Sequence, residues 1–187
     1  MLLIIEIEKF EFAEVECIMY KENNKISFST RVKELFIDWL VISAYLACLF
    51  IVCILFYKWV LKGIPTFTHI QSQIIAFVSS VLPVILFFTY LDYNGGSIGK
   101  RKMGLKLAYK NKNYSSALVR NIIKFLPWQL GHMGTIGGMY TGFNTISIVL
   151  EVLSVGLMLV LFFMGTIRND KRHLGDLIAG TQVLIEK

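Results

Sequence analysis

The stretch LFIDWLVISAYLACLFIVCILFY, residues 35–57, decides the class of this fold. At about 1.5 Å of rise per residue, an apolar helix of this length can cross a bilayer core of about 30 Å. The charge within it is Asp38, and a carboxylate inside a membrane helix costs at least about 2.5 kcal/mol on insertion scales. We therefore expect a membrane protein that supplies Asp38 with a compensating partner.

The composition of the 187 residues agrees with this class. Hydrophobic residues make up 55% and charged residues 17%, whereas soluble domains have about 45–50% and about 25%. Cys17, Cys48 and Cys53 are odd in number and lack metal-ligand spacing, so neither a disulfide framework nor a metal site is expected. The net charge of +6 comes without a nucleic-acid motif, so we assign it to lipid contact and topology and expect no nucleic acid partner.

Four apolar segments follow one another, at about residues 35–57, 74–91, 118–141 and 145–167. The second contains Pro83, which predicts a kink. The third is the weakest, because Pro127 and several glycines disfavour a straight helix. The sequence predicts an all-α membrane protein, a four-segment transmembrane bundle whose third segment is short or broken.

The distribution of Lys and Arg sets the orientation. These residues gather in 20–33, in 92–124 and in the tail after residue 167, and positively charged loops stay in the cytoplasm. Four crossings put all three regions on one side. We predict a multi-pass protein of the inner (cytoplasmic) membrane with both termini cytoplasmic.

Two short segments alternate between apolar and polar residues, as strands do: GLKLAY (104–109) and TQVLIE (181–186). We expect them to pair as a small cytoplasmic two-stranded β element, with the N-terminal arm, residues 1–25, as a candidate extension. The arm is rich in glutamate and does not resemble a signal peptide. An alternative stays open, in which translation begins at Met19 and residues 1–18 carry no function. We expect residues 26–187 to form a single membrane domain.

Asp38 is expected to meet a charged partner from another segment. Arg31 lies on the same helix face but about 10.5 Å away along the axis, too far for a direct pair, whereas Glu34 can pair with Arg31. Our hypothesis is that Arg31, Asp38, Arg120 and Asp176 form one charge network near the cytoplasmic interface. The alternative is that Asp38 is locally hydrated one turn from the interface.

Two further groups of residues are candidates. Glu151 and His132 would lie at a similar depth and could form a proton or ion relay, although Glu151 could equally hydrogen-bond a neighbour. In NGGSIGKRKMG (94–104), the residues required for a phosphate-binding loop are missing. Lys100, Arg101 and Lys102 are instead expected to contact anionic lipid head groups.

The sequence offers no catalytic set. The motifs HExxH, GxSxG and CxxC are absent from the sequence, and its three histidines are scattered. We therefore expect neither an enzyme nor a cofactor.

Four motifs in order give the chain a recognisable pattern. They are RVKELFIDWLV (31–41), GGSIGKRKMGLKL (95–107), SALVRNIIKF around Arg120, and DKRHLGDLIAGTQVL (170–184). Over about residues 26–186 the chain resembles the RDD family of bacterial integral membrane proteins, named for an arginine and two aspartates. By motif these correspond to Arg31, Asp38 and Asp176. The resemblance implies a multi-pass inner-membrane protein, and transport of a ligand, including cation/proton exchange, has been proposed for the family.

Two functions remain open at this point. The first is an accessory, regulatory or structural membrane protein, whose charge network is structural and whose sheet or glycine-rich turn binds a protein partner. The second is a small transporter or cation/proton exchanger that uses Asp38 and Glu151. A transporter of this size is expected to act as a homo-oligomer.

Overall fold

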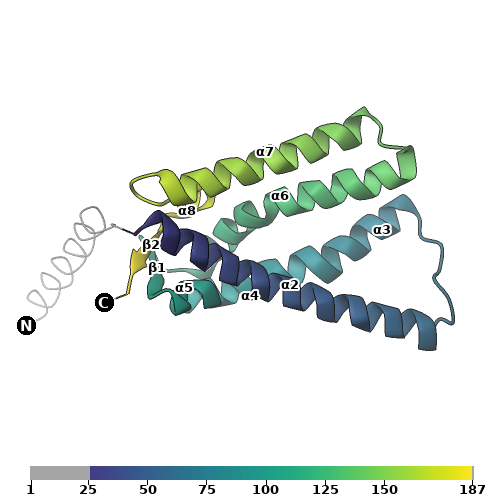
Figure 1. The fold of residues 1–187 in the computed structure, drawn as a ribbon, viewed down its shortest axis with the longest axis horizontal. Helices are drawn as coiled ribbons and strands as arrows, with labels where there is room; N and C mark the ends of the chain where they lie inside the picture. The colour runs from purple at the N-terminus through teal and green to yellow at the C-terminus, as the bar shows by residue number, and fades with distance from the viewer. Residues whose placement is uncertain (1–25, 187) are drawn as a thin grey trace, which may run out of the picture.

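The computed structural model describes residues 26–186 as a helical protein with one small sheet (Figure 1). The predictions for the arm, residues 1–25, lie outside the described residues. The elements in chain order are α2 (Phe28–Trp59), α3 (His69–Ala76), the π-helix η1 (Phe77–Val81), α4 (Leu82–Tyr93), α5 (Ile98–Lys102), β1 (Leu105–Tyr109), α6 (Tyr114–Thr141), α7 (Thr145–Ile167), α8 (Leu174–Ala179) and β2 (Thr181–Ile185).

Among residues 26–186, three helical stretches are long and apolar enough to cross a membrane. They are α2, the continuous stretch His69–Tyr93 formed by α3, η1 and α4, and α7. They coincide with the three strong apolar segments of the sequence. Large hydrophobic side chains on α2 and α7 point outward, among them Phe50 and Val152, which are each 66% exposed. An apolar surface of this extent is unusual for a soluble protein and fits a lipid environment.

The expectation that the third segment is short or broken is wrong. α6 is one continuous helix of 28 residues with Pro127 inside it. Its glycines form the contact with α7, where a Cβ at Gly134 would lie 3.0 Å from the Ser147 carbonyl oxygen. The Ser154 hydroxyl of α7 also donates to the Pro127 carbonyl at 2.7 Å. Close packing against α7 therefore offsets the poor intrinsic helix propensity of these residues.

The second stretch contains an irregularity next to Pro83. Proline has no N–H, so it cannot donate to the carbonyl of Ser79, four residues earlier. The Tyr45 hydroxyl of α2 donates to that carbonyl instead, at 2.5 Å. The π-helix η1 immediately precedes the proline turn, as is usual where a helix absorbs such a break. The carbonyl that Pro83 leaves without a helical donor therefore ties η1 to α2.

The predicted two-stranded sheet is present. β1 and β2 are antiparallel, with Leu105 opposite Ile185 and Tyr109 opposite Thr181. Leu105, Leu107 and Val183 are buried together with Ile26, which precedes α2. Burial of one face fixes the register of the pair.

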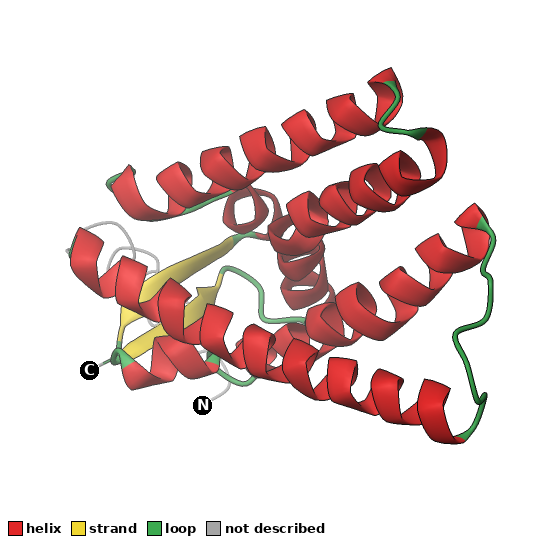
Figure 2. Cartoon of the chain, turned by 45° about the vertical axis from the view of Figure 1, so that its right-hand side comes forward, coloured by secondary structure: helices red, strands yellow, loops and turns green. Residues whose placement is uncertain are grey.

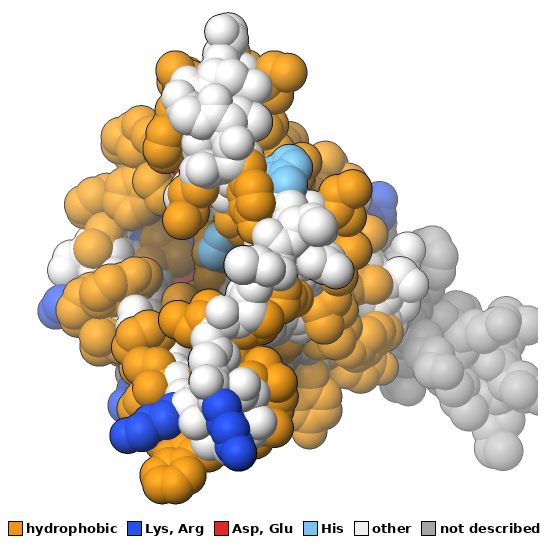
Figure 3. Space-filling view, turned by 90° about the vertical axis from the view of Figure 1, so that its right-hand side faces the viewer, with side chains coloured by type: hydrophobic (Ala, Val, Ile, Leu, Met, Phe, Trp, Pro, Cys, Tyr) orange, Lys and Arg blue, Asp and Glu red, His pale blue; other side chains and the backbone are white. Residues whose placement is uncertain are grey.

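The molecule has two distinct ends. β1, β2, α5 and α8 gather at one end, which we call the strand end (Figures 1 and 2). The connections 60–68 and 142–144 lie at the opposite end, the loop end. Figure 3 looks onto the loop end, where hydrophobic side chains cover most of the visible surface around a central hollow.

Candidate functional site: a buried charge network

Asp38 is buried at the strand end, 2% exposed, and α5 and α6 both contact it. The Gly99 N–H donates to its Oδ1 at 2.8 Å. Its Oδ2 lies 3.5 Å from Nζ of Lys124. Only glycine allows this approach of α5, because a Cβ at position 99 would lie 2.7 Å from Oδ1 of Asp38. The structure thus gives the carboxylate a basic partner from another helix.

Lys100 follows Gly99 and is completely buried. Its Nζ lies 3.3 Å from Oε1 of Glu34 and 3.2 Å from Oδ1 of Asp92. It also donates to the hydroxyl of Ser97, the residue that caps the start of α5, at 3.1 Å. The expected contact of Lys100 with lipid head groups is therefore corrected, because its ammonium faces two carboxylates inside the protein.

The other two residues of that expectation lie differently. Arg101 and Lys102 are exposed at the strand end. The Arg101 guanidinium donates to the Asn94 carbonyl at 3.0 Å. Lipid contact by these two residues stays a prediction.

Arg120 connects two segments that are far apart in the sequence. It is 1% exposed and forms an ion pair with Asp92 at the end of α4. Its Nε lies 2.6 Å from Oδ1 of Asp176 in α8. Asn121 donates to Asp92 at 3.1 Å, and the Thr181 hydroxyl donates to Asp176 at 2.8 Å. Each carboxylate therefore has a neutral donor besides its cation.

Arg31 lies at the edge of the cluster. It forms an ion pair with Glu34, one turn along α2. Its Nε donates to the Gly165 carbonyl of α7 at 3.1 Å. The seven-residue spacing to Asp38 indeed gives no direct pair in the structure. Arg31 instead joins α2 to α7.

Together these contacts form what we call the charge network. Its members are Arg31, Glu34, Asp38, Asp92, Lys100, Arg120, Lys124 and Asp176. A continuous path of ion pairs runs from Arg31 through Glu34, Lys100, Asp92 and Arg120 to Asp176. The pair of Asp38 and Lys124 adjoins this path through α5. Four cations face four carboxylates, so the buried charge is formally balanced.

Of the four residues predicted for the network, Arg120 and Asp176 pair directly. Arg31 is connected to them through the path of ion pairs, and Asp38 belongs to the adjoining pair with Lys124. The expected pair of Glu34 with Arg31 is present. The predicted network did not contain the connecting residues Glu34, Asp92, Lys100 and Lys124. One signal was available for Asp92, since it is the only acidic residue in 92–124 among eight basic ones.

Two titratable groups of the α8 region lie outside the spans. Burial by itself would raise the pKa of Asp176, but the Arg120 guanidinium, His173 and the hydrogen bonds from Arg120 and Thr181 together outweigh burial and hold that pKa well below its usual range. Burial lowers the pKa of His173 from 6.5 to about 3, against the opposing effect of Asp176. Asp176 is therefore ionised and His173 neutral at pH 7.

Glu151 and His132 lie nearer the loop end. The Thr135 hydroxyl donates to Oε1 of Glu151 at 2.5 Å. The Ser80 hydroxyl lies 3.2 Å from Nε2 of His132. The two residues thus have different hydrogen-bond partners, and the relay stays a prediction.

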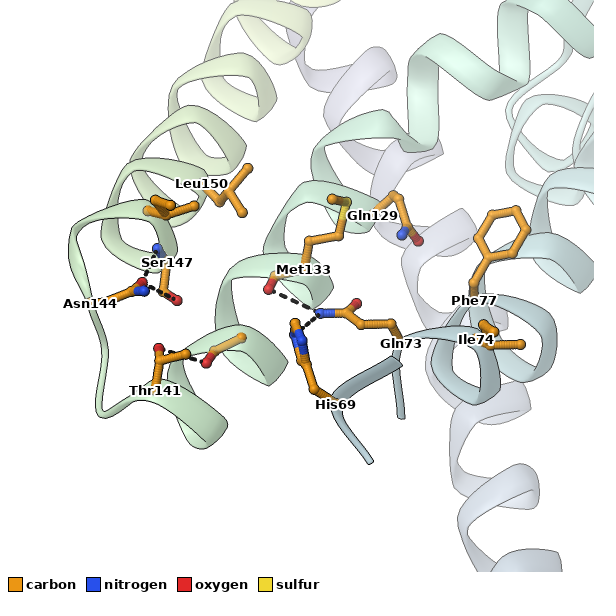
Figure 4. A pocket seen from close by; sticks show the side chains of 12 residues that line it. His69, Gln73, Ile74, Phe77, Gln129, Met133, Thr141, Asn144, Ser147 and Leu150 are labelled. Carbon is orange, nitrogen blue, oxygen red and sulfur yellow. Dashed lines mark hydrogen bonds between the residues drawn. The ribbon is translucent and has the colours of Figure 1, made fainter. Parts of the chain in front are cut away.

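A cavity of about 570 Å³ opens between α3, α6 and α7 near the loop end (Figure 4). Gln73 reaches across its mouth and donates to the Met133 carbonyl at 3.2 Å. On the opposite side, the Ser147 hydroxyl donates to Asn144 at 3.0 Å. The carbonyl oxygens of the Gln73 and Gln129 side chains have no hydrogen-bond partner. The lining is thus mixed, with polar groups from three helices. Among residues 26–186, no group of three or more His, Cys, Asp or Glu could hold a metal ion.

Comparisons with known proteins give a family and no individual relative. No curated protein and no solved structure matches the chain. The family model described as "RDD family" matches residues 27–180, from the residue before α2 to the residue after α8. This range contains the complete charge network, including the three motif residues Arg31, Asp38 and Asp176. The chain belongs to the RDD family.

Proposed function

We propose that this membrane protein has an accessory or regulatory role and does not transport, and that its charge network is a structural clamp. One observation carries the proposal: each charged group of the network already faces a fixed partner of opposite sign within the chain. A transport site must release its ion or proton in every cycle. Breaking a buried pair costs about 3–5 kcal/mol, which favours a permanent arrangement.

The proposal includes a multi-pass topology in the cell membrane with four crossings, of which α6 is the third. Both inter-helix connections 60–68 and 142–144 lie at the loop end, while the basic residues Arg101, Lys102 and Arg168 are exposed at the strand end. This distribution supports a cytoplasmic strand end under the positive-inside rule. A reporter fused after Lys187 should read out as cytoplasmic, and an extracellular signal would contradict the topology.

A regulatory role needs a surface for a partner, and the strand end offers one. A two-stranded sheet leaves one edge of each strand without a strand neighbour in the described part of the chain. Such edges can accept an added strand from another protein. Exposed Arg101 and Lys102 beside the sheet would hold the same surface against anionic head groups.

A flux assay tests the proposal. The full chain is reconstituted in vesicles, and cation and proton fluxes are followed under an imposed gradient. We expect wild type and Asp38→Asn to give the same flux as empty vesicles. Asp170→Asn serves as a matched control, because Asp170 is a partly exposed aspartate at the same end. A saturable flux in wild type that Asp38→Asn abolishes and Asp170→Asn preserves would overturn the accessory role.

The second candidate, transport, is favoured by one feature. The cavity near the loop end reaches Ser147 and Leu150, directly before Glu151 on α7. Glu151 with Thr135, and His132 with Ser80, then place titratable groups deeper in the bundle. For this candidate, Glu151→Gln should abolish the flux that wild type shows. A protein-dependent flux that Glu151→Gln leaves unchanged would remove Glu151 from any pathway.

A further inference from the structure

A second cavity lies between α2, α6 and α7, and the proposed function makes no use of it. Its volume is about 620 Å³, within the range of about 300–1,000 Å³ that is typical of ligand sites. At the strand end α2 and α7 are joined by the bond from Arg31 to Gly165. From there the two helices diverge, as Figures 1 and 2 show. We call the space between them the α2–α7 groove.

The lining of the α2–α7 groove changes character along its length. Its charged and titratable residues are confined to the strand end: Arg31, Glu34, Arg120, Lys124 and His173. Further along, the walls are mainly apolar, with Trp39, Leu46, Trp128, Met158 and Phe162. From residue 31 to residue 46, α2 rises about 22 Å. One leaflet of a bilayer core is about 15 Å thick, so the groove matches one leaflet and its head-group layer.

Two buried nitrogen donors at the charged end each lie within 3.5 Å of one carboxylate oxygen but make no hydrogen bond. Nζ of Lys124 makes no hydrogen bond, although it lies 3.5 Å from Asp38. His173 is 7% exposed, and its Nδ1 accepts the Gly175 N–H at 3.0 Å. The proton of the neutral ring is therefore on Nε2, which has no hydrogen-bond partner and lies 3.3 Å from Asp176 without hydrogen-bond geometry. Buried donors of this kind require an acceptor.

We propose that the α2–α7 groove binds one anionic phospholipid from the surrounding bilayer, with its phosphate at Lys124 and His173 and an acyl chain along Trp39 and Trp128. The phosphate supplies the acceptor oxygens that both donors lack. Arg31, Arg120 and Lys124 at the charged end are each paired with a carboxylate of the charge network, so the phosphate is favoured by the two donors that make no hydrogen bond and not by an excess of positive charge. The acyl chain covers the apolar wall, which a free phosphate would leave exposed.

The same features argue against a helix of another protein as the occupant. Its apolar side chains would cover the wall but would leave the donors of Lys124 and His173 without acceptors, at a cost for each buried group. The proposed site is also separate from head-group contact at Arg101 and Lys102, which lie outside the groove. The proposed lipid site does not depend on whether the protein transports an ion.

Tryptophan fluorescence can report on this site. Trp39 and Trp128 line the groove, with Trp39 itself 58% exposed, and Trp59 is 71% exposed at the far end of α2. The full chain with Trp59→Phe is reconstituted in phosphatidylcholine vesicles that contain either brominated phosphatidylglycerol or brominated phosphatidylcholine. We expect the anionic lipid to quench the two groove tryptophans beyond its mole fraction. Equal quenching by the two lipids would overturn the proposal.

Two variants separate the groove from the rest of the surface. Lys124→Gln should weaken the preference for the anionic lipid about fivefold, the effect of one cation near a membrane surface. Lys106→Gln removes an exposed cation of β1 at the same end, to which we assign no lipid contact, and should leave the preference unchanged. Loss of the preference in Lys106→Gln, or its retention in Lys124→Gln, would contradict the proposed site.

Because Lys124 also pairs with Asp38, a third variant leaves the charge network intact. Ser43→Phe fills the groove from α2 without any change of charge. It should abolish the preferential quenching while the melting temperature is retained. Persistence of the preference in this variant would place the lipid elsewhere. Added inorganic phosphate should not displace the lipid, and displacement would show that the acyl chain contributes nothing.

Discussion

Asp92→Asn is the sharpest test of the charge network. The substitution keeps the size of the side chain and removes one of four carboxylates, so four cations would face three. Asp92 is fully buried and contacts both Lys100 and Arg120. Each cation keeps a second partner, Glu34 or Asp176, but the center of the path is lost.

The expected loss of stability in Asp92→Asn follows from the burial of Asp92, Lys100 and Arg120. Leaving a buried charge uncompensated costs about 3–5 kcal/mol. For a chain of about this length, 1 kcal/mol lowers the melting temperature by about 2–4 °C, so the expected decrease is about 6–20 °C. Thermal unfolding of the purified protein in detergent, followed by the loss of the monodisperse peak in size-exclusion chromatography, measures this decrease.

The control is Asp170→Asn, the same substitution in a partly exposed pair with Arg168. Solvent screens such a pair, and the expected change in melting temperature is small. In the double variant Asp92→Asn/Lys100→Met, charge balance is restored, so its loss should be smaller than the sum of the two single losses. If Asp92→Asn is no more destabilising than Asp170→Asn, the network does not stabilise the fold.

Two further predictions concern the same end of the molecule. Gly99→Ala should destabilise the protein by about 1–3 kcal/mol, because its Cβ would lie 2.7 Å from Asp38 Oδ1. The control Gly156→Ala, whose Cβ would have nothing within 4 Å, should be neutral or stabilising. Equal melting temperatures for the two variants would refute this prediction. His173 should make wild type less stable as pH falls from about 6.5 toward 3, because only the unfolded chain binds its proton. Between pH 7 and 4.5, a range in which Asp176 stays ionised, His173→Asn should lose less stability than wild type. Equal losses in the two proteins would contradict the lowered pKa of His173.

Much of the fold could be predicted because its signals are local. The long apolar stretches predicted α2 and α7, and alternation in 104–109 and 181–186 predicted the sheet. The error on α6 has a tertiary cause. Pro127 and the glycines lower helix propensity, which is visible in the sequence, but the contact with α7 that offsets it is not.

The charge network was predicted only in part, for a similar reason. Asp38 stood out because it interrupts an apolar stretch. Lys100 did not, because three consecutive basic residues resemble a solvated turn. Its burial depends on the close approach of Gly99 to α2, a contact between positions 61 residues apart. In the sequence, the buried ion pairs around Lys100 were indicated only by Asp92, the one acidic residue among the basic residues of 92–124.

The ion pair of Arg120 with Asp176 also has a consequence for biosynthesis. The two residues are 56 positions apart, so at about 5–20 residues per second the ribosome needs about 3–11 s to make the second after the first. During this interval Arg120 has been made, while the carboxylate of α8 that pairs with it does not yet exist. We expect the nascent chain to depend on insertion factors or quality control in this window, and truncation before α8 to yield a rapidly degraded product.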